Sequence, residues 1–97
     1  MPWHVYLLRL DRGRIYVGCT NDLPRRLAEH RGGNGCRTTA LSATIQLLHQ
    51  ETLPGQTAAL ARERQLKGWS RAKKVALAEG RLDDLKRLAT SRQPAAM

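Results

Sequence analysis

The chain has 97 residues, 41% hydrophobic and 26% charged, and its 17 Lys and Arg outnumber 8 Asp and Glu, for a formal net charge of +9. This length and composition predict one globular domain over residues 1–89, followed by a flexible tail over 90–97, and exclude a disordered or multidomain protein. The charge predicts a polyanionic partner, most often nucleic acid. Because the cations are dispersed and no apolar run is long enough to span a bilayer, we expect a cytoplasmic protein with no membrane partner, monomeric by default.

Two segments rich in Val, Ile, Leu and Tyr open the chain, at residues 3–10 and 14–20. Both have the composition of strands. Only the turn sequence Asp11-Arg12-Gly13 lies between them, so the two segments are expected to fold back on each other as a hairpin.

The hairpin places its two tyrosines on one face. With a three-residue loop, Tyr6 faces Gly18 and Leu8 faces Tyr16. The tyrosines are then diagonal neighbours about 7–8 Å apart at the backbone, and Gly18 is expected to leave open space above the Tyr6 ring. The chain has only four aromatic residues and no Phe, so this layout favours a small reaction site over a packed core.

The remaining segments predict an α+β domain with a three-stranded antiparallel sheet flanked by helices. A helix begins at Asn21-Asp22-Leu23-Pro24, where a carboxylate cap precedes a proline, and ends at Arg31-Gly32-Gly33. The later elements are a flexible polar loop over 32–42, a strand over 44–52, and helices over 57–69, 71–79 and 81–89.

Several polar residues occupy positions that point inward on the predicted helices. Arg26 and His30 are four apart and share a helix face, and Glu63 lies on the inward side of a later helix. That carboxylate needs a positive partner, either a flanking base or a metal ion. Each residue also has a plainer interpretation: Arg26 as a solvated cation, His30 as a helix-end residue, Glu63 as a salt-bridged surface acid and Tyr6 as a core residue.

The two cysteines and three histidines do not have the spacing of a metal knuckle. Nothing favours a disulfide, so free thiols are expected and a zinc site is not. The residues concerned are Cys19, Cys36, His4, His30 and His49.

Taken together, the segments resemble the GIY-YIG nuclease superfamily over roughly residues 3–80. Tyr6 stands where the first family motif ends, and Tyr16-Val17-Gly18 matches the second. The segment 20–30 is similar to the one that follows the motifs, 61–67 is similar to the acidic helix, and 69–74 is similar to the small stand-alone bacterial members of the UPF0213-like group. The chain departs from the family pattern at His4-Val5, at Cys19 where some members carry lysine, and at Val75 and Ala76 where some carry asparagine.

The resemblance implies a catalytic set and a cofactor. Glu63 would hold one divalent ion, Mg²⁺ or Mn²⁺, Tyr6 would act as general base or position the attacking water, and Arg26 would bind the scissile phosphate. Tyr16 and His30 would complete the pocket. We expect nucleic acid to contact a wider set of basic residues, namely Arg25, Arg37, Lys67, Arg71, Lys73 and Lys74.

The predicted function is a metal-dependent DNA endonuclease of low sequence specificity, acting in DNA repair or recombination, with DNA rather than RNA as the partner. One alternative is a binding module that keeps the scaffold and cleaves little or nothing. A basic structural or ribosome-associated protein would account for the charge but not for the inward position of Glu63.

Overall fold

The computed structural model of the chain describes residues 1–35, 37–40, 42 and 44–80. The predicted helix over 81–89, the predicted tail over 90–97 and Cys36 lie outside those residues.

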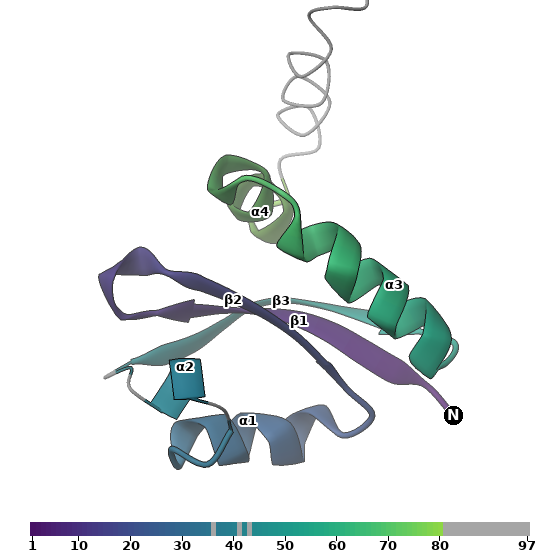
Figure 1. The fold of residues 1–97 in the computed structure, drawn as a ribbon, viewed down its shortest axis with the longest axis horizontal. Helices are drawn as coiled ribbons and strands as arrows, with labels where there is room; N and C mark the ends of the chain where they lie inside the picture. Colours follow the sequence, from purple (N-terminus) through teal and green to yellow (C-terminus); the bar gives the residue numbers. More distant parts are fainter. Residues whose placement is uncertain (36, 41, 43, 81–97) are drawn as a thin grey trace, which may run out of the picture.

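The three strands form one antiparallel sheet with the first strand in the middle (Figure 1). β1 (Trp3–Leu10) pairs with β2 (Ile15–Thr20) on one side and with β3 (Ile45–Leu53) on the other. The predicted fold class, α+β with a three-stranded antiparallel sheet, is therefore confirmed. A central strand is covered on both faces, and the run Val5–Leu8 is correspondingly buried without a polar break. β2 is left as an edge strand.

The hairpin has the predicted register. Tyr6 pairs with Gly18 and Leu8 pairs with Tyr16. A 3₁₀ turn, η1 (Asp11–Gly13), closes the loop, and its last two residues have positive φ angles of 60° and 72°. That left-handed backbone suits Gly13 and is uncommon for an arginine, so Arg12 occupies a tightly defined turn position.

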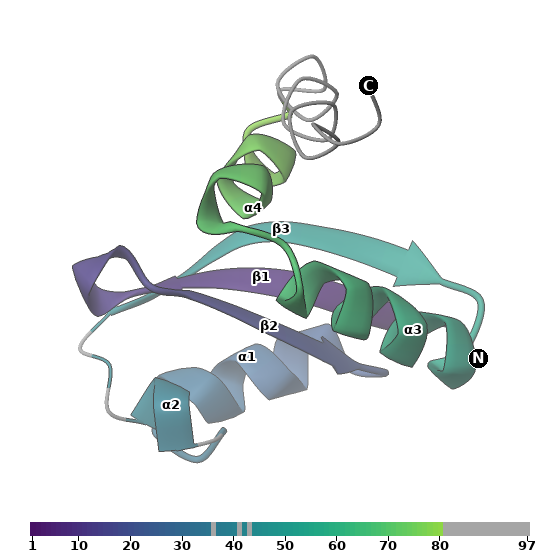
Figure 2. The same cartoon turned by 45° about the horizontal axis from the view of Figure 1, so that its top comes forward.

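The two faces of the sheet are covered by different helices (Figures 1 and 2). Side chains alternate along a strand, so neighbouring residues of β1 contact different helices. α1 (Leu23–Arg31) covers the face that bears Tyr6, whereas α3 (Gln56–Lys67) covers the other. The cluster on the α1 face contains Tyr6, Leu8, Leu10, Leu23 and Leu27, and the cluster on the α3 face contains Val5, Leu7, Val17, Ala59 and Leu66.

Two of the described helices begin with a side-chain cap, and the one before α1 was predicted from the sequence. The Asp22 side chain accepts a hydrogen bond from the Arg25 N–H, one residue after Pro24. Ser70 caps α4 (Arg71–Ala78) by accepting from the Lys73 N–H.

The segment predicted as a flexible loop over 32–42 contains a short helix instead, α2 (Arg37–Ala40). Thr39 in this helix is 1% exposed. The loop prediction was wrong for these four residues because it was based on local polarity, whereas Thr39 is buried and bonds His30 of α1.

Candidate active site

The centre of the candidate site is a hydrogen bond between two buried side chains. The Tyr6 hydroxyl lies 2.9 Å from Nε2 of His30, and the two residues are 1% and 0% exposed. Tyr6 reaches this position from the central strand and His30 from the last full turn of α1. A buried phenol and imidazole that satisfy each other form a stable polar pair inside an apolar layer.

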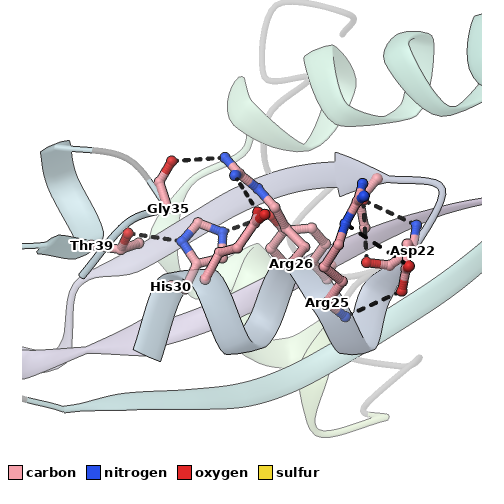
Figure 3. A network of polar contacts seen from close by, with 9 residues as sticks. Asp22, Arg25, Arg26, His30, Gly35 and Thr39 are labelled. Atoms are coloured by element: carbon pink, nitrogen blue, oxygen red, sulfur yellow. Dashed lines mark hydrogen bonds and ion pairs between the residues drawn. The ribbon is translucent and has the colours of Figure 1, made fainter. Parts of the chain in front are cut away.

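The second ring nitrogen of His30 is also bonded. Nδ1 lies 2.8 Å from Oγ1 of Thr39 (Figure 3). Burial lowers the pKa of His30, and the nearby Arg26 charge lowers it further. The ring is therefore neutral at pH 7, and a neutral imidazole donates from one nitrogen and accepts at the other. If Tyr6 donates to Nε2, then Nδ1–H donates to Thr39, and the three residues form one directional chain.

Arg26 places a fixed cation beside the phenol. Its guanidinium donates to Oε1 of Glu29 at 2.9 Å and to the carbonyl oxygen of Gly35 at 3.0 Å (Figure 3). The hydrogen bond with Glu29 raises the pKa of Arg26, and an interaction with the Tyr6 hydroxyl raises it further. The Arg26 side chain keeps 30% of its surface exposed, so it can also meet a ligand from solvent.

Tyr16 completes the cluster. Its ring centroid lies 6.4 Å from that of Tyr6 and 5.4 Å from that of His30. The sequence predicted open space between Gly18 and the Tyr6 ring. In the structure the Tyr6 ring instead packs directly against Gly18. A Cβ built on Gly18 would lie 2.6 Å from the Tyr6 hydroxyl and 3.0 Å from the Tyr16 ring. Gly18 is therefore the residue over which both tyrosines pack, and only glycine fits there.

Two residues of the site were missed by reasoning from the sequence, Gly35 and Thr39. Gly35 accepts the Arg26 hydrogen bond, and a Cβ at position 35 would overlap the His30 ring. The available signal was the glycine-rich run that follows α1, which allows a close backbone approach. Nothing local to Thr39 distinguishes it from the other hydroxyl residues of that segment.

Glu63 lies apart from this cluster, on the opposite face of the sheet. It belongs to α3, and its carboxylate lies near enough to the thiol of Cys19 on the edge strand to shift the pKa of that thiol. Burial raises the pKa of that thiol, and the Glu63 charge raises it further. Lys67 Nζ lies 3.6 Å from Oε2 of Glu63. Since Cys19 follows Gly18 along β2, the carboxylate and the phenols flank the same short stretch of this strand from its two sides.

This donor set fits a metal ion only in part. Within residues 1–35, 37–40, 42 and 44–80, no three His, Cys, Asp or Glu side chains gather as a ligand set. Glu63 offers one carboxylate, 18% exposed, next to a thiol and an ammonium. A single carboxylate is enough for a Mg²⁺ ion that takes its remaining ligands from waters and substrate phosphate.

The predicted nucleic-acid-binding residues are spread over several elements. Arg25 is exposed beside Asp22, and Arg37 is the first residue of α2. Lys67 pairs with Glu63, and the Lys73 ammonium lies 4.4 Å from the centre of the Trp69 ring. Arg71 and Lys74 lie near the tip of the β1–β2 hairpin. The second cation over Trp69 is Arg62, at 5.3 Å, which also donates two hydrogen bonds to Glu51.

Comparison with known proteins agrees with these features. The family model described as the GIY-YIG catalytic domain matches residues 2–76. A UPF0213 protein of Xanthomonas axonopodis pv. citri is 41% identical over 75 residues, which cover 77% of this chain and 74% of that protein. A UPF0213 protein of Haloquadratum walsbyi is 38% identical over 76 residues, covering 78% and 85%.

Solved structures give the same assignment. The solution structure of a UPF0213 protein from Bacillus halodurans has a TM-score of 0.53 and 32% identity, covering 81% of this chain and 84% of that one. A protein structure from E. faecalis has a TM-score of 0.58 and 27% identity, covering 82% and 85%. No helix in the part of the chain that the structure describes is long and apolar enough to cross a membrane. With both family motifs on neighbouring strands and the match spanning most of its length, the chain belongs to the GIY-YIG family and, within it, to the UPF0213 group.

Proposed function

We propose that this protein is a metal-dependent DNA endonuclease of low sequence specificity. The observation that carries the proposal is the buried Tyr6 hydroxyl, which is bonded to a neutral imidazole and lies beside the guanidinium of Arg26. A phenol is a poor base at neutral pH, since its ordinary pKa is about 10. The neighbouring cation favours the phenolate that a general base requires, and the imidazole is placed to accept the phenolic proton.

The proposed reaction is hydrolysis of a phosphodiester. Tyr6 passes its proton to Nε2 of His30 and then takes a proton from the attacking water. A bond forms between the water oxygen and phosphorus, the bond from phosphorus to one ester oxygen breaks, and the departing alkoxide takes a proton from solvent. The protonated His30 then releases its extra proton to solvent, which restores the neutral imidazole and the phenol. The N–H groups of Arg26 that are not bound to Glu29 or Gly35 bind the scissile phosphate and stabilise its developing charge. Tyr16 and Arg26 form the part-exposed side through which the phosphate approaches.

Glu63 would hold a single Mg²⁺ or Mn²⁺ ion, which when bound neutralises charge on the phosphoryl oxygens. A DNA strand that crosses the free edge of β2 at Gly18 and Cys19 would have the phenols on one side and Glu63 on the other. That arrangement supports one site assembled around an edge strand rather than within a single cleft.

The partner and setting follow from charge and from family membership. A net charge of +9 supports binding to a polyanion through phosphate contacts, with an affinity that falls steeply as salt rises. We propose DNA rather than RNA as the substrate, repair or recombination as the process, and the cytoplasm as the location. Since phosphate contacts carry no sequence information, specificity for sequence is expected to be low.

The test is cleavage of a labelled panel of single-stranded, nicked, flapped and duplex DNA, with matched RNA, in Mg²⁺, Mn²⁺ or chelator. Wild type is compared with Tyr6→Phe, Glu63→Gln and, as a control that removes a carboxylate elsewhere, Glu79→Gln. Metal-dependent products that both site variants lose and the control retains support the proposal. Equal cleavage by all four proteins would indicate a contaminating nuclease and contradict it.

A second candidate function is a binding module that cleaves nothing. The ion pair between Glu63 and Lys67 favours it, because a lysine at 3.6 Å competes with a metal ion for the carboxylate. Binding of DNA by wild type with no products in any metal would establish this alternative.

A further inference from the structure

A cationic hollow lies beside the candidate active site. It has a volume of about 430 Å³ and lies between the tip of the β1–β2 hairpin and α4. Seven residues line it, namely Leu10, Arg12, Arg14, Ile15, Tyr16, Arg71 and Lys74.

The floor and the rim of the hollow differ in chemistry. The floor consists of Leu10, which is 2% exposed, together with the part-buried Ile15 and Tyr16. Four cations make up the rim. An apolar and aromatic floor under a ring of positive charge is the arrangement that proteins use to hold a base on its face and a phosphate at its edge.

The rim cations remain available to a ligand. Arg14 pairs with Asp11 at 2.8 Å, but neither Arg12 nor Lys74 forms an ion pair within the described residues. Arg71 donates to the carbonyl oxygen of Gly13 at 2.6 Å. That bond fixes α4 against the hairpin and leaves the guanidinium charge unneutralised, so the rim keeps an excess of positive charge.

Tyr16 belongs to both sites. Its ring contacts Tyr6 and His30 in the candidate active site, and Tyr16 is also one of the residues that line the cationic hollow. A nucleotide in the hollow therefore shares one lining residue, Tyr16, with the candidate active site. The volume is at the lower end of the 300–1,000 Å³ range of small-molecule sites, which admits one nucleotide and no stretch of duplex.

We infer that the cationic hollow holds one unpaired nucleotide next to the scissile phosphate, so that the protein selects single-stranded or flapped DNA over continuous duplex. The inference deepens the proposed function and rests on it only in taking DNA as the ligand. The base lies on the floor, and its phosphate lies between Arg12 and Lys74.

Binding without cleavage tests the inference. Fluorescence anisotropy in chelator compares a single strand, a flapped duplex and a blunt duplex at equal length and salt. We expect wild type to bind the first two about tenfold more tightly than the blunt duplex. The double variant Arg12→Gln/Lys74→Gln should lose about tenfold on single-stranded and flapped DNA and less than threefold on blunt duplex.

A matched control removes two charges that do not line the hollow, Arg31→Gln/Arg64→Gln. This variant should weaken binding to all three ligands alike, because it changes only the general phosphate attraction. Equal losses on the three ligands for both double variants would overturn the inference, as would a preference of wild type for blunt duplex.

A second measurement separates the floor from the rim. Replacing the unpaired base next to the flap junction by an abasic site leaves the phosphates intact and should weaken binding about tenfold. Unchanged affinity would show a purely electrostatic site, equally suited to an acidic peptide, and would contradict the seating of a base. Because cleavage is not measured, these outcomes are independent of whether the protein is a nuclease.

Discussion

The Tyr6 hydroxyl and Nε2 of His30, from the central strand and from α1, lie 2.9 Å apart and are almost completely shielded from solvent. Their hydrogen bond is a structural contact. It is also the bond along which the first proposed proton transfer takes place. Substitutions can separate these two roles.

Removing the phenolic oxygen should affect both stability and cleavage. Tyr6→Phe leaves a buried ring nitrogen without its partner, which should lower the free energy of unfolding by about 1–3 kcal/mol. Urea denaturation measures this loss, and a DNA cleavage assay on the folded fraction should show a decrease of at least about 100-fold. A Tyr6→Phe protein that is destabilised and still cleaves at the wild-type rate would remove Tyr6 from the reaction.

The hydroxyl of Thr39 should act as a positioning group for His30. Thr39→Val keeps the shape of the side chain and removes the bond to Nδ1, so stability should fall by about 1–2 kcal/mol. Thr39→Ser keeps the hydroxyl and should restore the wild-type pH profile of cleavage. If Val and Ser variants have identical pH profiles, Thr39 serves packing alone.

The stability of the protein should decrease on mild acidification because of His30. Its folded-state pKa is lowered by burial, below the ordinary value of about 6.5. As the pH falls through that value, the unfolded chain binds a proton that the folded chain does not, so the free energy of unfolding decreases. Urea midpoints at pH 7.5 and 5.5 measure the slope, and His30→Gln should flatten it. An equal slope in the variant would assign the effect to other groups.

A methyl group at position 18 should disrupt the site. Gly18→Ala places a Cβ 2.6 Å from the Tyr6 hydroxyl and should cost about 1–3 kcal/mol through overpacking. The control is Gly68→Ala, where the nearest neighbour is an ordinary contact at 3.5 Å. Thermal unfolding compares the two, and equal stability would mean that the tyrosine rings move aside without cost.

The ion pair between Glu51 and Arg62 should stabilise the other face of the sheet. Arg62 donates to both carboxylate oxygens of Glu51 at 2.8 and 2.9 Å, and these bonds lower the pKa of Glu51. The resulting stability is present at neutral pH and is lost as the pH falls below the ordinary value of a glutamate. Glu51→Gln should therefore lower stability at pH 7 by about 1–3 kcal/mol and show less further loss at pH 3–4. A full-sized acid transition in the variant would contradict this.

Local patterns predicted the hairpin and its register because two short apolar segments joined by a three-residue turn leave few other pairings. The same reasoning placed Arg26 and His30 on one helix face, and both contact Tyr6 in the structure. The position of Glu63 relative to the tyrosines could not be read in this way. Helical spacing shows that a residue points inward but does not show which face of the sheet its helix covers.

Thr39 illustrates the same limit. Its surroundings in the sequence are polar and rich in glycine, and its bond to His30 of α1 joins residues nine positions apart, which local composition does not predict. The composition also predicted the net positive charge, but it did not predict where on the molecule the cations lie. The cations of the hollow come from the hairpin turn and from α4, which meet through the bond between Arg71 and the Gly13 carbonyl.

The place of β1 between its two partners has a consequence for assembly. The three residues of the buried Tyr–His–Thr chain all lie within the first 39 positions, yet the strand that supports the chain gains its second neighbour only when Leu53 meets Trp3 across fifty positions. Closing so long a loop is entropically expensive. The strand over 45–53 carries none of the proposed catalytic residues, and even so β1 becomes a central strand only once this later segment has paired with it.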